Sequence, residues 1–327
     1  MQLPIIRRAF PLAIALGLCA APAAQAADAA YPDHPITIVV PYSPGGGVDI
    51  VTRLVTKKMS DELGQSFVVD NKPGAGTNIG MAYVANAKPD GYTLYTASNT
   101  LTANKALYSK LTFDPATAFA AVGRIGEAPL VVVVNQDSPF KNLQDLVEYG
   151  RSHPEDLTFG TAGVGSSGHL ASELLLRAGK FKALHVPYKG GSPAITDLLG
   201  GRLSFMSINP LEVVSHIQAG KLRALAVLNA KGTPLLPGLK TASAQGLTDL
   251  EATVWWGIVA PAGTPDAIVG KLNAALNSAL GDPEVKASLA KLGAQELPGT
   301  PQAFRAFLDK ETGTLTQVIK EGNIHAD

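Results

Sequence analysis

Cysteine is almost absent from this chain, whose 327 residues contain only Cys19. That residue lies in an N-terminal segment that we expect to be removed. Stability in an oxidising compartment must then come from core packing and not from disulfides. The six histidines show neither H-x-x-x-H nor H-E-x-x-H spacing. The sequence therefore gives no metal-binding motif, and we expect no metal or other cofactor.

A surplus of positive charge is also lacking, since lysine plus arginine and aspartate plus glutamate number 27 each. Such a chain has nothing to attract nucleic acid or an anionic membrane, so we expect no nucleic-acid partner. Long apolar runs are missing after the N-terminal segment. The runs of about 5–8 residues suit buried strands and are too short for a membrane span, which needs about 18.

Residues 1–26 have the pattern of an export signal. Arg7 and Arg8 precede an apolar stretch that is broken by Pro11, and Ala24-Gln25-Ala26 is a small-residue cleavage pattern. We predict export with cleavage near Ala26. The route, general or twin-arginine, stays open because no Ser or Thr precedes the arginine pair.

From residue 36 onward, strand-like runs alternate with helical segments. Examples are the apolar runs 36–40, 67–69 and 130–134. The alternation predicts an α/β fold with mostly parallel sheets and helices on both faces. About 300 mature residues exceed the length at which a single hydrophobic core usually stops growing, so we expect two domains. Apparent crossings near 124–129 and 225–229 predict a first domain of residues 27–125 and 228–327 around a second of residues 126–227.

Loops rich in glycine and in hydroxyl or amide side chains follow several of these runs. They lie at residues 44–49, 74–78, 98–100, 163–168 and 189–193. Glycine lets backbone N–H groups form a concave donor nest, and the dipole of a following helix adds to it. Because arginine is not clustered in these loops, the donors are mostly neutral. This favours a small carboxylate over a polyphosphate.

Residues 163–169 resemble two motifs other than a simple binding loop, a dinucleotide fingerprint and a hydrolase nucleophile elbow. The run matches the G-x-G-x-x-G dinucleotide fingerprint, but the next strand, near 185–188, lacks the required acid. It also nearly matches the hydrolase elbow G-x-S-x-G, with Ser167 as nucleophile and His169 as base. No nearby acid orients that histidine. We interpret Ser167 as a hydroxyl donor and keep a secreted serine hydrolase as the alternative.

Two further features have structural interpretations. We expect Asp49 to cap the helix that starts beside it, because acids at helix starts usually do so. Trp255 and Trp256 are adjacent on a predicted strand, so one should lie in the core while the other faces a cleft.

In the order of its segments the chain resembles the Bug-type extracytoplasmic solute receptors, the periplasmic binding component of tripartite tricarboxylate transporters. The resemblance spans the mature chain and includes PYSPGGGVD at 41–49 and GKLRALAV at 220–227. Further matching stretches lie at 31–36, 71–76, 88–94, 160–169, 186–191 and 260–265.

The resemblance implies a two-lobed periplasmic binding protein of type II, not an enzyme, that closes over a carboxylated solute. We expect it to be a monomer that binds the membrane subunits of such a transporter. The alternative is that it binds a signalling protein. In relatives, loops from both lobes hold one carboxylate. By position these loops contribute Ser43, Gly45 and Gly46 opposite Ala162, Gly163 and Ser167, with Thr77, Asn78, Ser98, Asn99 and Tyr188 lining the remainder.

One departure from the family concerns the ligand. Relatives that bind amino acids often carry an acid near residues 207–209, whereas Ser207-Ile208-Asn209 is neutral here. The resemblance then implies a di- or tricarboxylate or an aromatic acid as ligand.

Overall fold

The computed structural model describes residues 31–248 and 250–326. The predicted export segment, residues 1–26, lies outside them. The elements below all belong to one compact unit, Pro32–Asp327. Among the described residues, no helix combines the length and the apolar character that a membrane crossing requires.

The first sheet contains strands from both ends of this unit. Its spatial order is β11-β4-β10-β3-β1-β2. The strands are β1 (Ile36–Val40), β2 (Phe67–Asn71), β3 (Thr93–Ala97), β4 (Phe119–Pro129), β10 (Thr253–Pro261) and β11 (Gln295–Glu296). β1 pairs in parallel with β2 and β3, whereas β10 is antiparallel to both β3 and β4.

The second sheet contains the middle of the chain, in the order β7-β6-β8-β5-β9. Its strands are β5 (Val131–Asn135), β6 (Thr158–Thr161), β7 (Leu184–Pro187), β8 (Phe205–Ile208) and β9 (Leu222–Val227). β6 is parallel to β7 and β8, and β5 is antiparallel to β8 and β9. Val131–Val134 of β5 are completely buried, as their apolar run predicts.

Both sheets follow one plan: second strand, first, third, an inserted strand, then fourth. The inserted strand is β10 in the first sheet and β5 in the second, and it opposes the strands beside it. Most strands of each sheet therefore run in one direction, as expected for mostly parallel sheets. The pairing itself is mixed, because each sheet accepts a strand that arrives from the other one.

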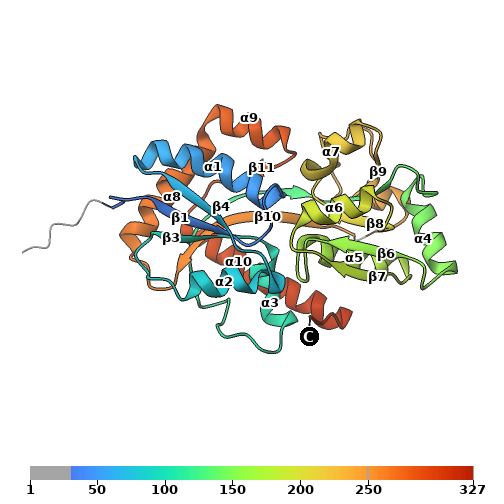
Figure 1. Ribbon diagram of the computed structural model, residues 1–327, viewed down its shortest axis with the longest axis horizontal. Coiled ribbons are helices and arrows are strands. Elements are labelled where there is room, and N and C mark those ends of the chain that lie inside the picture. The colour runs from blue at the N-terminus through green and yellow to red at the C-terminus, as the bar shows by residue number, and fades with distance from the viewer. Residues whose placement is uncertain (1–30, 249, 327) are drawn as a thin grey trace, which may run out of the picture. The chain divides into compact units, whose positions relative to one another are not determined.

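Helices cover both faces of the first sheet (Figure 1). One layer contains α1 (Gly47–Leu63), α8 (Asp266–Gly281) and α9 (Pro283–Lys291), and the other contains α2 (Asn78–Ala85), α3 (Asn99–Leu107) and α10 (Pro301–Gly322). Thr300 caps α10 and Asp282 caps α9, each followed by proline in the first helical position. Trp255 packs against Phe304 and Phe307 of α10. These elements form the first lobe.

The second lobe forms around the second sheet. Its helices are α4 (Leu143–Ser152), α5 (Ser167–Gly179), α6 (Gly191–Leu199) and α7 (Pro210–Gln218). α6 begins at Gly191, and α7 begins at Pro210 after the N-cap Asn209, a pair of residues that is typical of a helix start. Arg151 of α4 donates to the Gly179 carbonyl at the end of α5 (2.7 Å).

The chain passes between the lobes at two adjacent points. β4 continues into β5 through Leu130, and the segment before β10 ends at Ala252. The Leu130 amide donates to the Ala252 carbonyl (3.1 Å), and the Leu228 amide donates to the Leu130 carbonyl (2.8 Å). Residues 228–252 also bond to β9, where the Ala242 amide donates to the Val227 carbonyl (3.0 Å). This segment is thus held against the second sheet.

Candidate functional site

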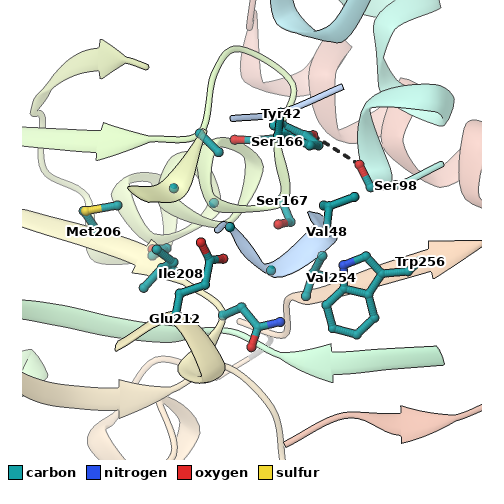
Figure 2. Close-up of a pocket in the computed structure, with 17 residues that line it drawn as sticks. Tyr42, Val48, Ser98, Ser166, Ser167, Met206, Ile208, Glu212, Val254 and Trp256 are labelled. Atoms are coloured by element: carbon teal, nitrogen blue, oxygen red, sulfur yellow. Dashed lines mark hydrogen bonds between the residues drawn. The ribbon is translucent and has the colours of Figure 1, made fainter. Parts of the chain in front are cut away.

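A cavity of about 50 Å³ lies where loops of the two lobes meet, large enough for a few water molecules or one carboxylate group (Figure 2). Every loop that reaches it follows the carboxyl end of a strand or borders β10, as the topology of such sheets requires. The lining residues are Tyr42, Gly46, Gly47, Val48, Ser98, Ala162, Ser166, Ser167, Gly168, Gly191, Met206, Ser207, Ile208, Asn209, Glu212, Val254 and Trp256.

The first lobe contributes hydroxyl groups that are bonded to one another. The Tyr42 hydroxyl lies 3.1 Å from the Ser98 Oγ and 3.4 Å from the Thr100 Oγ1, and all three groups are buried. Burial raises the pKa of Tyr42, so the phenol stays protonated and able to donate. Figure 2 shows the Tyr42–Ser98 pair above the cavity.

Asp49 stabilises the loop between β1 and α1. Its carboxylate accepts hydrogen bonds from the Gly45 amide, from Arg53 and from Asn71, each at 3.0 Å. Burial opposes its ionisation, but these bonds outweigh burial and lower its pKa. Gly45 adopts φ +80°, a left-handed conformation that favours glycine. The N-cap of α1 is Gly46, without a side-chain cap, so Asp49 holds the preceding loop from the third helical position and does not fill the capping role expected for it.

The second lobe contributes the starts of three helices. Ser166 caps α5 by accepting from the His169 amide (3.3 Å), and Asn209 caps α7 by accepting from the Leu211 amide (3.0 Å). Gly191 opens α6 against Glu212: a Cβ at Gly191 would lie 2.1 Å from the Glu212 Oε2. Only glycine allows this close approach.

Glu212 is the one carboxyl among the described lining residues, and no lysine, arginine or histidine lines the cavity with it. Its Oε2 is buried without a hydrogen-bond partner. Burial raises its pKa to about 7, although the Gly47 amide acts in the opposite direction. In Figure 2 its carboxyl group points from α7 into the space between the loops.

Four of the residues predicted for the site line the cavity, namely Gly46, Ser98, Ala162 and Ser167. Ser43 lies beside it and joins the lobes, because both its amide and its Oγ donate to the Lys189 carbonyl at 3.0 Å. Gly45 and Gly163 shape their loops with positive φ and do not belong to the wall.

The other four predicted residues make supporting contacts outside the wall. The Asn78 Oδ1 accepts from Asn104 (2.8 Å), next to the buried Thr77. Asn99 donates to the Thr253 carbonyl (3.2 Å), which fixes α3 against β10. The Tyr188 hydroxyl donates to Asp197 (2.5 Å), and burial followed by that carboxylate raises the pKa of Tyr188 to about 12.

The sequence did not indicate Tyr42 or Glu212 as site residues. The local pattern at Glu212 indicates a different role. Asn209-Pro210-Leu211-Glu212 fits the capping-box pattern, in which the acid bonds back to the helix start. Here the Glu212 side chain faces the cavity instead. Of the tryptophan pair, Trp256 lines the cavity and Trp255 belongs to the first-lobe core, as its alternation along a strand predicts.

His169 has an environment that does not suit a general base for Ser167. Its Nδ1 accepts from the Gly165 amide (3.2 Å), and its Nε2 lies 3.7 Å from the Glu173 carboxylate. Its ring stacks on His185, with centroids 4.1 Å apart. Burial, and then the charge of His185, lower the pKa of His169 to about 3. Among the described residues, no group of three or more His, Cys, Asp or Glu could hold a metal ion.

Two α/β lobes with the same strand plan, joined at two crossing points and enclosing a cavity of neutral donors, define a two-lobed solute-binding protein. Residues 51–324 match the family described as "Tripartite tricarboxylate transporter family receptor". The chain belongs to this family, the Bug-type receptors.

Curated relatives resemble the chain over most of their length. It is 38% identical over 305 residues to a UPF0065 protein in the tcbD-tcbE intergenic region of Pseudomonas sp. (strain P51), covering 93% of this chain and 90% of that protein. It is 34% identical over 294 residues to protein BugT of Bordetella pertussis (strain Tohama I), covering 89% and 90%.

Solved structures agree with this assignment. The periplasmic binding protein BugD superposes with a TM-score of 0.87 at 33% identity, covering 90% of this chain and 99% of that one. A protein of R. palustris with adipate gives a TM-score of 0.87 at 34% identity, covering 90% and 99%. MatC of Rhodopseudomonas palustris with bound malate gives 0.85 at 33% identity, covering 88% and 100%.

Proposed function

We propose that this receptor captures a small carboxylate, a di- or tricarboxylate or an aromatic acid, and delivers it to the membrane subunits of a tripartite tricarboxylate-type transporter. The observation that carries the proposal is the cavity wall, to which both lobes contribute residues with neutral N–H and O–H groups. Such donors suit a small anion. The adipate and malate in related structures support the same ligand class.

The carboxylate would contact the lining donors of both lobes. These are Gly46 and Ser98 of the first lobe, with Ala162 and Ser167 of the second. Tyr42 and Ser166 line the same wall and would add their hydroxyl groups. Ser43, Gly45, Thr77, Asn78, Asn99, Gly163 and Tyr188 would act by holding the loops in place.

Binding would proceed by closure of the lobes about the two crossing points. Direct bonds between the lobes support this idea, such as Ser43 to the Lys189 carbonyl and Ser192 to the Pro44 carbonyl (3.4 Å). We place the crossings at Leu130 and Ala252. The second lobe then includes residues 228–252, which bond to β9, beyond the boundary expected from the sequence.

The protein would act in the periplasm as a monomer after removal of residues 1–26. The BugD structure, which is that of a periplasmic binding protein, supports this location. The predicted export signal supports it independently.

Calorimetry on the mature protein tests the ligand class, with malate and adipate compared with their primary diamides. We expect binding of at least one acid and much weaker binding of its diamide, because a neutral amide cannot form the charge-assisted hydrogen bonds that a carboxylate forms with the lining donors. Equal affinities for acid and amide would contradict the proposal. Small-angle scattering should show a smaller radius of gyration with the bound acid, and an unchanged profile would contradict closure.

A further inference from the structure

Glu212 is placed in the cavity by the start of α7. Asn209 and Pro210 fix that start, and the side chain two residues further on reaches across to the first lobe. There the Oε1 lies 3.0 Å from the position that a Cβ on Gly47 would occupy, and the Gly47 backbone amide opposes the burial that raises the pKa of the carboxyl group. The Oε2 is the oxygen that remains buried without a partner.

Among the described residues that line the cavity, no charged group compensates Glu212. On α1, Asp49 and Arg53 are paired with each other. On α6, Asp197 is paired with Arg202, and on β9, Arg223 donates to the carbonyls of residues 136, 138 and 140. His216 on α7 itself does not line the cavity, and Tyr42 faces it as a neutral phenol.

An ionised Glu212 would repel a ligand carboxylate strongly in this enclosed space, where the effective dielectric constant is low. A neutral Glu212 has the opposite effect. The Oε2 is buried without a hydrogen-bond partner, so it is the oxygen that can carry the proton and donate it to a ligand. An O–H group donated to a carboxylate forms a charge-assisted hydrogen bond, which is stronger than a bond between neutral groups.

We propose that Glu212 binds the ligand carboxylate as a neutral acid, so that the receptor takes up one proton when it loads above neutral pH. The proposal rests on the proposed function and adds a specificity-determining residue to it. Glu212 then admits anions at acidic and neutral pH and excludes them at basic pH. The pKa of about 7 places the change in a range that binding experiments can reach.

The test is calorimetry from pH 6 to pH 9 with malate or adipate, whichever binds more tightly at pH 6, in two buffers of different ionisation enthalpy. Affinity scales with the protonated fraction of Glu212, so we expect it to fall about tenfold from pH 7.5 to pH 8.5. Proton uptake should approach one per ligand at pH 8.5. Glu212→Gln keeps a donor but cannot ionise, so its affinity should not change with pH.

Glu251→Gln is the matched control, because Glu251 is exposed; this variant should retain the wild-type fall. A pH-independent affinity of the wild type would overturn the role of Glu212 and leave the proposed function intact. Affinity that rises with pH and is lost in Glu212→Gln would mean that an ionised Glu212 accepts a donor from the ligand. Failure of the wild type to bind any carboxylic acid at pH 6 would overturn the proposed function itself.

Discussion

The two lobes each place an acidic side chain in the first turn of a helix that starts at the cavity, and they treat it in opposite ways. Asp49 of the first lobe accepts bonds from an amide, an arginine and an asparagine, and its pKa is lowered. Glu212 of the second lobe has a raised pKa and a free Oε2. The partners of a carboxyl group, and not its position in a helix, thus decide whether it holds a loop or meets a ligand.

The lobes also differ in the side chains behind their loops. Beside the first-lobe loop lie the hydroxyls of Tyr42, Ser98 and Thr100, which stay neutral over the usual pH range. Behind the second-lobe loop lie the stacked rings of Phe159, His169 and His185. Acid should therefore affect the second lobe first.

The largest expected effect is acid destabilisation of the second lobe. Burial lowers the pKa of His169 to about 3 and that of His185 to about 4, from 6.5. Because the folded-state values lie below the unfolded one, the stabilisation is complete above pH 6.5 and is lost as the pH falls. At pH 5 the loss is about 2 kcal/mol for each histidine. Urea unfolding at pH 7 and pH 5 measures this loss in the free energy of unfolding.

Hydrogen exchange shows where the loss occurs. Amides of β6 and α5 should lose protection at pH 5 before those of β1 and α1. His153→Gln serves as the control, because His153 is exposed and the variant should keep the acid loss. Equal loss of protection in both lobes would contradict the expectation that acid affects the second lobe first.

Next in size is the effect of filling the contact between Gly46 and Glu212. Gly46 has φ −81°, so a larger residue is not strained there. A Cβ would lie 3.5 Å from the Glu212 Oε2, an ordinary contact. The branches of Gly46→Val would occupy the ligand space, and we expect carboxylate affinity to fall about a hundredfold, or about 2.7 kcal/mol. Gly46→Ala should cost much less. Equal affinities in titrations of the two folded variants would remove this loop from the site.

The two acids themselves should respond with opposite signs. Asp49→Asn loses charge-assisted bonds and should lower the free energy of unfolding by about 2 kcal/mol. Glu212 has a raised pKa, so its stabilisation is complete below pH 4.5 and is lost as the pH rises through about 7. Glu212→Gln should then stabilise the protein at pH 8, by about 3 kcal/mol. Denaturant titrations at pH 8 compare them, and two changes of the same sign would contradict the contrast.

The smallest expected effects come from single hydroxyls. Ser167→Ala removes one donor to the ligand and should weaken carboxylate binding about fivefold to tenfold, near 1 kcal/mol. Ser98→Ala should weaken it less, because that hydroxyl is shared with Tyr42 and Thr100. A larger loss in Ser98→Ala would place the main anchor in the first lobe.

Local patterns in the sequence predicted the parts of the fold that depend on neighbouring residues. The apolar run of β5 and the Asn209-Pro210 start of α7 are examples. The insertion of β10 between β3 and β4 could not be predicted, because it pairs residues more than a hundred positions apart. α4 also has a local start signal, because the Asn142 side chain caps it by accepting from the Asp145 amide.

The site shows the same limit. The loops that contain Gly46, Ser98, Ala162 and Ser167 could be predicted, because glycine and hydroxyl residues mark them locally. Glu212 could not be placed, since its direction depends on contacts with Gly47 and Gly191 from two other loops. Thr77 and Asn78 have suitable chemistry, but Asn104 already bonds to Asn78.

The C-terminal helix has a practical consequence for anyone who turns this receptor into a fluorescent sensor. Leu315 and Ile319 of α10 pack with Leu107 of α3 and with Leu170 of α5, which belongs to the second lobe. The Ala326 amide donates to the Leu107 carbonyl (3.1 Å). A reporter domain fused after Ala326 would be attached beside a contact between the lobes and would shift the proposed open-to-closed balance that it is meant to report. Dyes on the exposed surfaces of α9 and α4 would leave that balance undisturbed.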